Sequence, residues 1–121
     1  MQQLGADLAR LLQAGDVVAL SGPLGAGKTT LVQGLAVGLG ITEQVTSPTF
    51  VVERRYQPGL RGIGLVHVDA YRLTGPQEFR DLELDEQLSS IVVVEWGAPH
   101  LAALMSVWVD VVIQRDELPL D

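Results

Sequence analysis

Residues 22–29 combine three glycines with a lysine and a threonine in the spacing Gly-x4-Gly-Lys-Thr. Glycines let the backbone curl so that successive N–H groups point at one anion. A helix that begins near Lys28 would add the positive end of its dipole at the same place. A buried strand before the loop and a helix after it are the context that this pattern requires. The stretch therefore predicts a cradle for the phosphates of ATP or a related nucleotide, rather than an ordinary glycine-rich turn.

Within this loop, two side chains would have distinct chemical roles. Lys28 would neutralise the β- and γ-phosphates, and the Thr29 hydroxyl would coordinate Mg²⁺, which prefers hard oxygen ligands. Lys28 is the only lysine among eight basic residues, so arginine supplies the rest of the positive charge. A compact, flexible ammonium suits a position between phosphates better than a planar guanidinium does. The predicted nucleotide-binding residues are Gly22, Leu24, Gly25, Ala26, Gly27, Lys28, Thr29 and Thr30.

Hydrolysis would also need a metal anchor and groups that position water. Glu95 follows the hydrophobic run 91–94, and Asp69 follows the run 65–68. Both should lie at the carboxyl edge of the sheet, where open α/β sheets bind ligands. Thr49, in a Ser-Pro-Thr turn, lies where phosphate-loop switches carry a threonine that senses the γ-phosphate. The alternative for these residues is ordinary strand-end charge and an ordinary turn.

His67 lies two residues before Asp69, so on a strand both side chains would face the same side. A lone strand histidine is more often structural than functional. Trp96, directly after Glu95, is interpreted in the same way, as core or rim packing.

Hydrophobic periodicity predicts alternating helices and strands. Helices are expected at about 4–14, 28–39, 74–88 and 99–105, and strands at 17–21, 49–56, 63–69, 91–96 and 107–113. The two segments before and after residues 57–59 should form an antiparallel hairpin. The order indicates an α/β protein, a P-loop NTPase-like three-layer sandwich with a mixed, mainly parallel central sheet. Gly34 and Gly38, inside a predicted helix, are interpreted as close-packing positions.

Composition narrows the class of protein further. The length of 121 residues predicts one domain, residues 1–121, and the absence of cysteine excludes disulfide frameworks and thiol catalysis. No apolar run approaches the ~20 residues of a membrane span, so a cytoplasmic protein is expected. The net charge of −7 and the lack of a basic cluster disfavour direct, tight binding of nucleic acid.

Four motifs, in this order and with these spacings, resemble the bacterial TsaE (YjeE) family of small ATPases over about residues 4–98. They are Leu24-Gly25-Ala26-Gly27-Lys28-Thr29-Thr30, Ser47-Pro48-Thr49-Phe50, His67-Val68-Asp69-Ala70-Tyr71-Arg72-Leu73 and Val94-Glu95-Trp96. Four separated motifs are far more specific than the phosphate loop alone.

The resemblance implies a slow, partner-dependent ATPase in the threonylcarbamoyladenosine modification of tRNA. It implies that the protein acts on a complex of TsaD and TsaB, and that the partners hold the tRNA. By matching positions, Thr29 and Glu95 would hold Mg²⁺, while Thr49, Asp69 and Glu95 would support hydrolysis. Tyr71, Arg72 and Trp96 would belong to the nucleotide site or to the partner surface.

The sequence departs from the family pattern at Pro23, where the family commonly has Asp, and a tolerated change of turn shape is expected there. Relative to the family, the chain is expected to be shortened at both ends, which affects how the adenine is held. Two other functions share a phosphate loop and stay open: a small-molecule kinase and a nucleotide-dependent switch without useful hydrolysis.

Overall fold

The computed structural model describes residues 2–23, 27–45, 53–73 and 75–114, and within these ranges five strands form one sheet in the order β2-β3-β4-β1-β5. Strands β3, β4, β1 and β5 run parallel, and β2 is antiparallel to β3. The strands are β1 (Val17–Ser21), β2 (Glu53–Tyr56), β3 (Gly64–Asp69), β4 (Ser90–Glu95) and β5 (Val109–Val112). The prediction of a mixed, mainly parallel sheet is confirmed.

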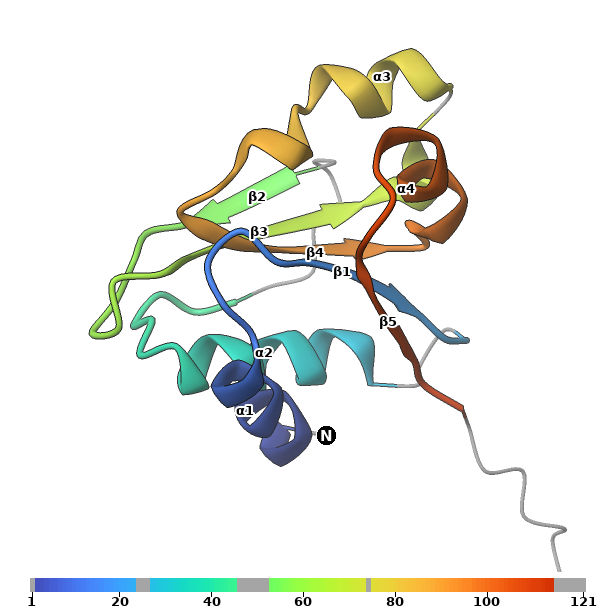
Figure 1. Cartoon of the computed structure of the whole chain (residues 1–121). Coiled ribbons are helices and arrows are strands. Elements are labelled where there is room, and N and C mark those ends of the chain that lie inside the picture. Colours follow the sequence, from blue (N-terminus) through green and yellow to red (C-terminus); the bar gives the residue numbers. More distant parts are fainter. Residues whose placement is uncertain (1, 24–26, 46–52, 74, 115–121) are drawn as a thin grey trace, which may run out of the picture.

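Helices cover both faces of this sheet (Figure 1). Helices α1 (Gln2–Leu11) and α2 (Lys28–Gly38) lie on one face, and α3 (Pro76–Asp81) and α4 (Ala98–Leu104) lie on the other. Two short 3-10 helices, η1 (Ala70–Arg72) and η2 (Leu84–Glu86), follow β3 and α3. Among the described helices, none is long and apolar enough to cross a membrane.

Side-chain alternation divides the core into two clusters, one on each face of the sheet. Leu65 of β3 and Val93 of β4 pack with Leu35 of α2, on the face covered by α1 and α2. Val66 and Val94 pack on the opposite face, with the residues of α3 and α4. The alternation decides which strand-end side chains can meet the phosphate loop, because α2 begins at that loop.

Helices α1 and α2 approach each other closely through glycine. A Cβ atom at Gly34 would lie 2.0 Å from the carbonyl oxygen of Gln2, and one at Gly5 would lie 2.0 Å from the carbonyl oxygen of Leu31. Gly38 is also closely packed, though less so, since its Cβ would lie 2.6 Å from the Cβ of Ala9. The interpretation of Gly34 and Gly38 as close-packing positions is confirmed.

The acidic segment after β3 does not form the single helix expected over residues 74–88. Helix α3 ends at Asp81, Glu83 adopts a left-handed conformation with φ 53°, and η2 follows. Phe79 and Leu84 are both buried, yet on one continuous helix they would point about 140° apart. The break in the helix lets both side chains enter the same core cluster.

Candidate functional site

The carboxyl ends of β1, β3 and β4 lie side by side at one edge of the sheet. In the strand register Leu20 is opposite Glu95, and Glu95 is opposite Asp69. Register partners on neighbouring strands start about 4.8 Å apart and point to the same face. The two predicted carboxylates are therefore neighbours, and β1 leads from the same edge into the phosphate loop.

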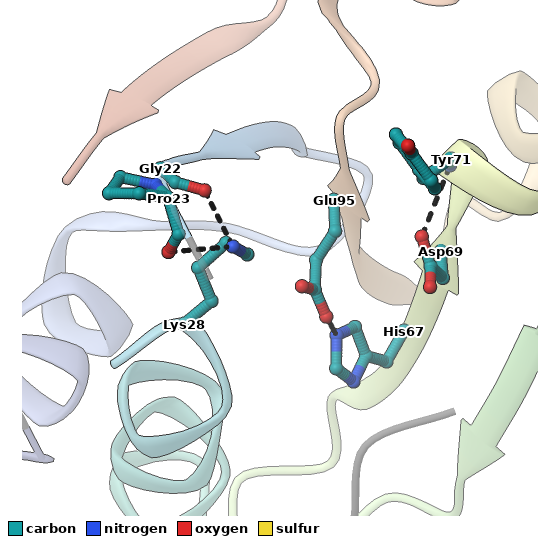
Figure 2. A network of polar contacts seen from close by, with 7 residues as sticks. All are labelled: Gly22, Pro23, Lys28, His67, Asp69, Tyr71 and Glu95. Atoms are coloured by element: carbon teal, nitrogen blue, oxygen red, sulfur yellow. Dashed lines mark hydrogen bonds and ion pairs between the residues drawn. The ribbon is translucent and has the colours of Figure 1, made fainter. Parts of the chain in front are cut away.

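Lys28 is the first residue of α2 and is almost completely buried, with 8% of its surface exposed. Its Nζ donates hydrogen bonds to the carbonyl oxygens of Gly22 at 2.6 Å and Pro23 at 3.3 Å (Figure 2). Gly27 precedes it in a left-handed conformation with φ 96°, which glycine adopts without strain. The ammonium group is thus held within the loop by backbone carbonyls.

The indole ring of Trp96 also lies against this ammonium group. Its ring centroid lies 4.8 Å from the Nζ of Lys28, a cation–π distance. Trp96 has φ 60°, which is unusual for a bulky residue and marks local backbone strain. The backbone N–H of Trp96 donates a hydrogen bond to the backbone carbonyl of Leu20 at 2.9 Å, so the turn after β4 is fixed to the end of β1. The strained turn at Trp96 brings its indole ring over Lys28.

Glu95 and His67 form a buried polar pair beside the loop. The Nε2 of His67 lies 2.6 Å from Oε2 of Glu95. His67 is fully buried and Glu95 is 7% exposed. Figure 2 shows the Glu95 carboxylate between the imidazole of His67 and the amino group of Lys28. A positive and a negative side chain thus face the same sheet edge, both largely shielded from water.

Asp69 faces the same edge but has a visible structural role. Its Oδ1 accepts a hydrogen bond from the N–H of Tyr71 at 3.1 Å and so caps η1. Tyr71 is 77% exposed, and its ring lies 6.0 Å from the ring of Trp96 in a tilted arrangement. The predicted strand-end carboxylate is therefore next to Glu95, with one oxygen engaged by the backbone.

The structure describes only some of the residues that the sequence singles out. Thr29 and Thr30 lie in the first turn of α2 and are partly exposed. Thr49, together with Leu24, Gly25 and Ala26, lies outside the described residues. Within the described part, no three His, Asp or Glu side chains gather as a metal site. His67, Asp69 and Glu95 are neighbours without forming a cage for a bare ion.

Two contacts were not predicted from the sequence. Taken alone, His67 and Trp96 are interpreted as mainly structural, and the family resemblance implies a place for Trp96 in the nucleotide site or the partner surface. In the structure His67 is bonded to Glu95, and Trp96 lies over Lys28. The sequence offers one signal that His67 belongs to the site: by strand alternation its side chain shares a face with Asp69, a predicted site residue. The partner of His67 depends on the register between β3 and β4, which spacing along the chain does not reveal.

The fold and the loop together define an α/β protein of the P-loop NTPase-like class. Residues 1–118 match the family model described as "Threonylcarbamoyl adenosine biosynthesis protein TsaE". The chain belongs to the TsaE family.

Individual relatives agree with the family match. The chain is 60% identical over 99 residues to the Streptomyces coelicolor protein named tRNA threonylcarbamoyladenosine biosynthesis protein TsaE. The aligned region covers 80% of this chain and 67% of that relative. The protein of the same name from Mycobacterium bovis is 44% identical over 120 residues, covering 93% of this chain and 71% of the relative. The crystal structure of YdiB from Bacillus subtilis has a TM-score of 0.72 at 34% identity, covering 94% of this chain and 69% of that structure.

Proposed function

We propose that this chain binds ATP with Mg²⁺, hydrolyses it slowly, and acts on a TsaD–TsaB complex in the threonylcarbamoyladenosine modification of tRNA. The matching family model and the similar proteins are named for that biosynthesis. The observation that carries the ATP part of the proposal is the buried Lys28 ammonium at the start of α2, beside the Glu95 carboxylate.

The residues at this edge fit a nucleotide phosphate. The carbonyls of Gly22 and Pro23 are the hydrogen-bond partners of Lys28, and phosphate oxygens can replace them as acceptors. Gly27 has no side chain to cap α2, so first-turn N–H groups can bind an anion. Trp96 shields the ammonium from water on one side, which strengthens its attraction for an anion.

The same residues fit Mg²⁺ bound together with a nucleotide, rather than a bare ion. Mg²⁺ usually takes one or two protein oxygens and fills the rest of its shell with waters and phosphates. The Thr29 hydroxyl and one oxygen of Glu95 would supply those protein ligands. When bound, the ion would neutralise charge on the phosphates.

In this proposal the residues of the chain bind the phosphates and orient the attacking water. Lys28 would hold the β- and γ-phosphates, and the α2 N-terminus would fix their position. Asp69, next to Glu95 in the register, and Thr49 would orient the water that attacks. Because the proposed hydrolysis depends on the partner complex, hydrolysis by the chain alone is expected to be slow.

The test is ADP release measured with the chain alone and with TsaD–TsaB. Faster release in the presence of the partners, together with co-purification that depends on ATP, supports the proposal. Transfer of phosphate to a metabolite would instead identify a kinase. Binding of ATP without hydrolysis, unchanged by the partners, would identify a switch.

A further inference from the structure

His67 is the most deeply buried polar side chain near the candidate site. It has no exposed surface, and its register partner on β4 is Val93. Its Nε2 contacts Oε2 of Glu95 at 2.6 Å, while its Nδ1 is buried with no hydrogen-bond partner among the described residues. Within the part of the chain that the structure describes, the ring therefore has one polar contact and apolar neighbours on its face of the sheet.

The chemistry of the two groups assigns the direction of this contact. In the proposed function Glu95 binds Mg²⁺ as a carboxylate, and a carboxylate can only accept, so in that state the Nε2 of His67 carries the hydrogen and donates it. The donated hydrogen bond fixes Oε2 and so restricts rotation of the carboxylate. The other oxygen, Oε1, is then held on the side of Lys28 and the phosphate loop (Figure 2).

Packing alone does not account for a histidine at this position. Leu65, two residues earlier on the same face of β3, and Val93 beside it are both apolar. Burying the polar imidazole ring in this layer costs free energy of desolvation, and an apolar side chain here would avoid that cost. What the imidazole supplies, and Leu or Val does not, is the N–H that reaches Glu95.

We propose that His67 is a positioning residue for Glu95: it fixes one carboxylate oxygen so that the other is oriented for Mg²⁺ bound with the nucleotide. This proposal rests on the proposed function, because it takes Glu95 as a ligand of the ion. Hydrogen bonds from a neighbouring side chain commonly orient metal ligands in this way, and removing them weakens metal affinity about 10- to 100-fold.

The experiment separates metal binding from nucleotide binding and from folding. ADP affinity is measured by titration calorimetry in EDTA, and Mn²⁺ affinity of the ADP complex by electron paramagnetic resonance. His67→Leu should weaken Mn²⁺ binding at least about tenfold and leave ADP affinity in EDTA nearly unchanged. His67→Gln, which keeps an N–H at a similar reach, should restore most of the Mn²⁺ affinity.

Two further variants sharpen the result. His100→Leu changes the other histidine of the chain, which stacks on Phe79 between α3 and α4, and should behave as the unmodified protein. In an E95Q background, His67→Leu should have no further effect on Mn²⁺, because coupled residues are not additive.

Unchanged Mn²⁺ affinity in His67→Leu would overturn the proposal. Equal losses of ADP affinity in EDTA and of Mn²⁺ affinity would overturn it too, since the role would then be structural. Failure of the unmodified chain to bind Mn²⁺ with ADP would instead refute the proposed function.

Discussion

Lys28 is the side chain on which the proposed nucleotide affinity depends most directly. Its ammonium group is buried and donates hydrogen bonds to two backbone carbonyls. It can therefore donate to phosphate oxygens instead with little rearrangement. Charge-assisted hydrogen bonds contribute about 1.5–3 kcal/mol each, and we therefore expect Lys28→Ala to weaken ATP binding about a hundredfold or more. Titration calorimetry with ATP and Mg²⁺ measures this.

A matched control for charge is Arg10→Ala, which also removes one positive charge. Arg10 is exposed and pairs with Asp7 within α1, away from the loop. This variant should bind ATP as the unmodified chain does. Normal binding by Lys28→Ala would show that the site is assigned wrongly.

Trp96 should report the occupancy of the loop, because its ring lies over the Lys28 ammonium. If a phosphate draws the Lys28 ammonium away from the carbonyls, the electric field at the indole ring changes, and with it the fluorescence emission. The chain has two tryptophans, and Trp108 bonds Asp110 through its Nε1. In a Trp108→Phe variant the remaining emission should change on addition of ADP, whereas in Trp96→Phe it should not. The opposite pattern would contradict the placement of Trp96.

At the scale of the elements, α1 packs closely against α2, and α2 begins at Lys28, the last part of the phosphate loop. Replacing Gly34 by Ala would favour the helix by about 1 kcal/mol, but the new Cβ would lie 2.0 Å from the Gln2 carbonyl oxygen. Backbone cannot move aside cheaply, so the clash should win, and we expect a net loss of about 1–3 kcal/mol of unfolding free energy. Urea denaturation measures it.

Gly75→Ala is the matched control, because apart from its chain neighbours no atom of the described residues lies within 4 Å of a Cβ built at Gly75. Its unfolding midpoint should stay close to that of the unmodified chain. Since α2 starts at Lys28, Gly34→Ala should also weaken ATP binding. An unchanged midpoint for Gly34→Ala would mean that α1 can separate from α2 without cost.

Local signals predicted the elements best where both ends are marked. The strand at residues 17–21 was predicted with its observed bounds, since Gly15-Asp16 and the glycine loop enclose one apolar run. The helix expected over residues 74–88 was too long, because the break at Glu83 follows from burying Phe79 and Leu84 together. That requirement comes from the sheet and is not visible in the segment itself.

The site could be predicted in part for the same reason. Lys28, Asp69 and Glu95 each stand at the end of a recognisable element, so their shared edge followed from the fold class. The contact of His67 with Glu95 depends on strand register, and the position of the Trp96 ring depends on a φ of 60°. Neither quantity is encoded by spacing along the chain.

At the scale of the whole molecule, the net negative charge disfavours tight binding of RNA by this chain alone. The net charge is −7, and Arg54-Arg55 is the densest basic pair in the sequence. Arg55 donates hydrogen bonds to Glu53 and Gln87, and the one that it donates to the Glu53 carboxylate raises the pKa of the Arg55 guanidinium. Part of even this small basic patch is therefore neutralised within the chain.

We accordingly expect the isolated chain to bind tRNA more weakly than about 0.1 mM, the weak end of non-specific binding at physiological salt. Fluorescence anisotropy with labelled tRNA measures this, first with the chain alone and then with TsaD–TsaB added. The partners should bind the tRNA, and adding this chain with ATP should change the anisotropy only when they are present. Tight binding by the chain alone that weakens with salt and is lost in Arg54→Ala would contradict the expectation. It would assign the basic pair a direct role, because contacts to phosphates make affinity fall steeply with salt.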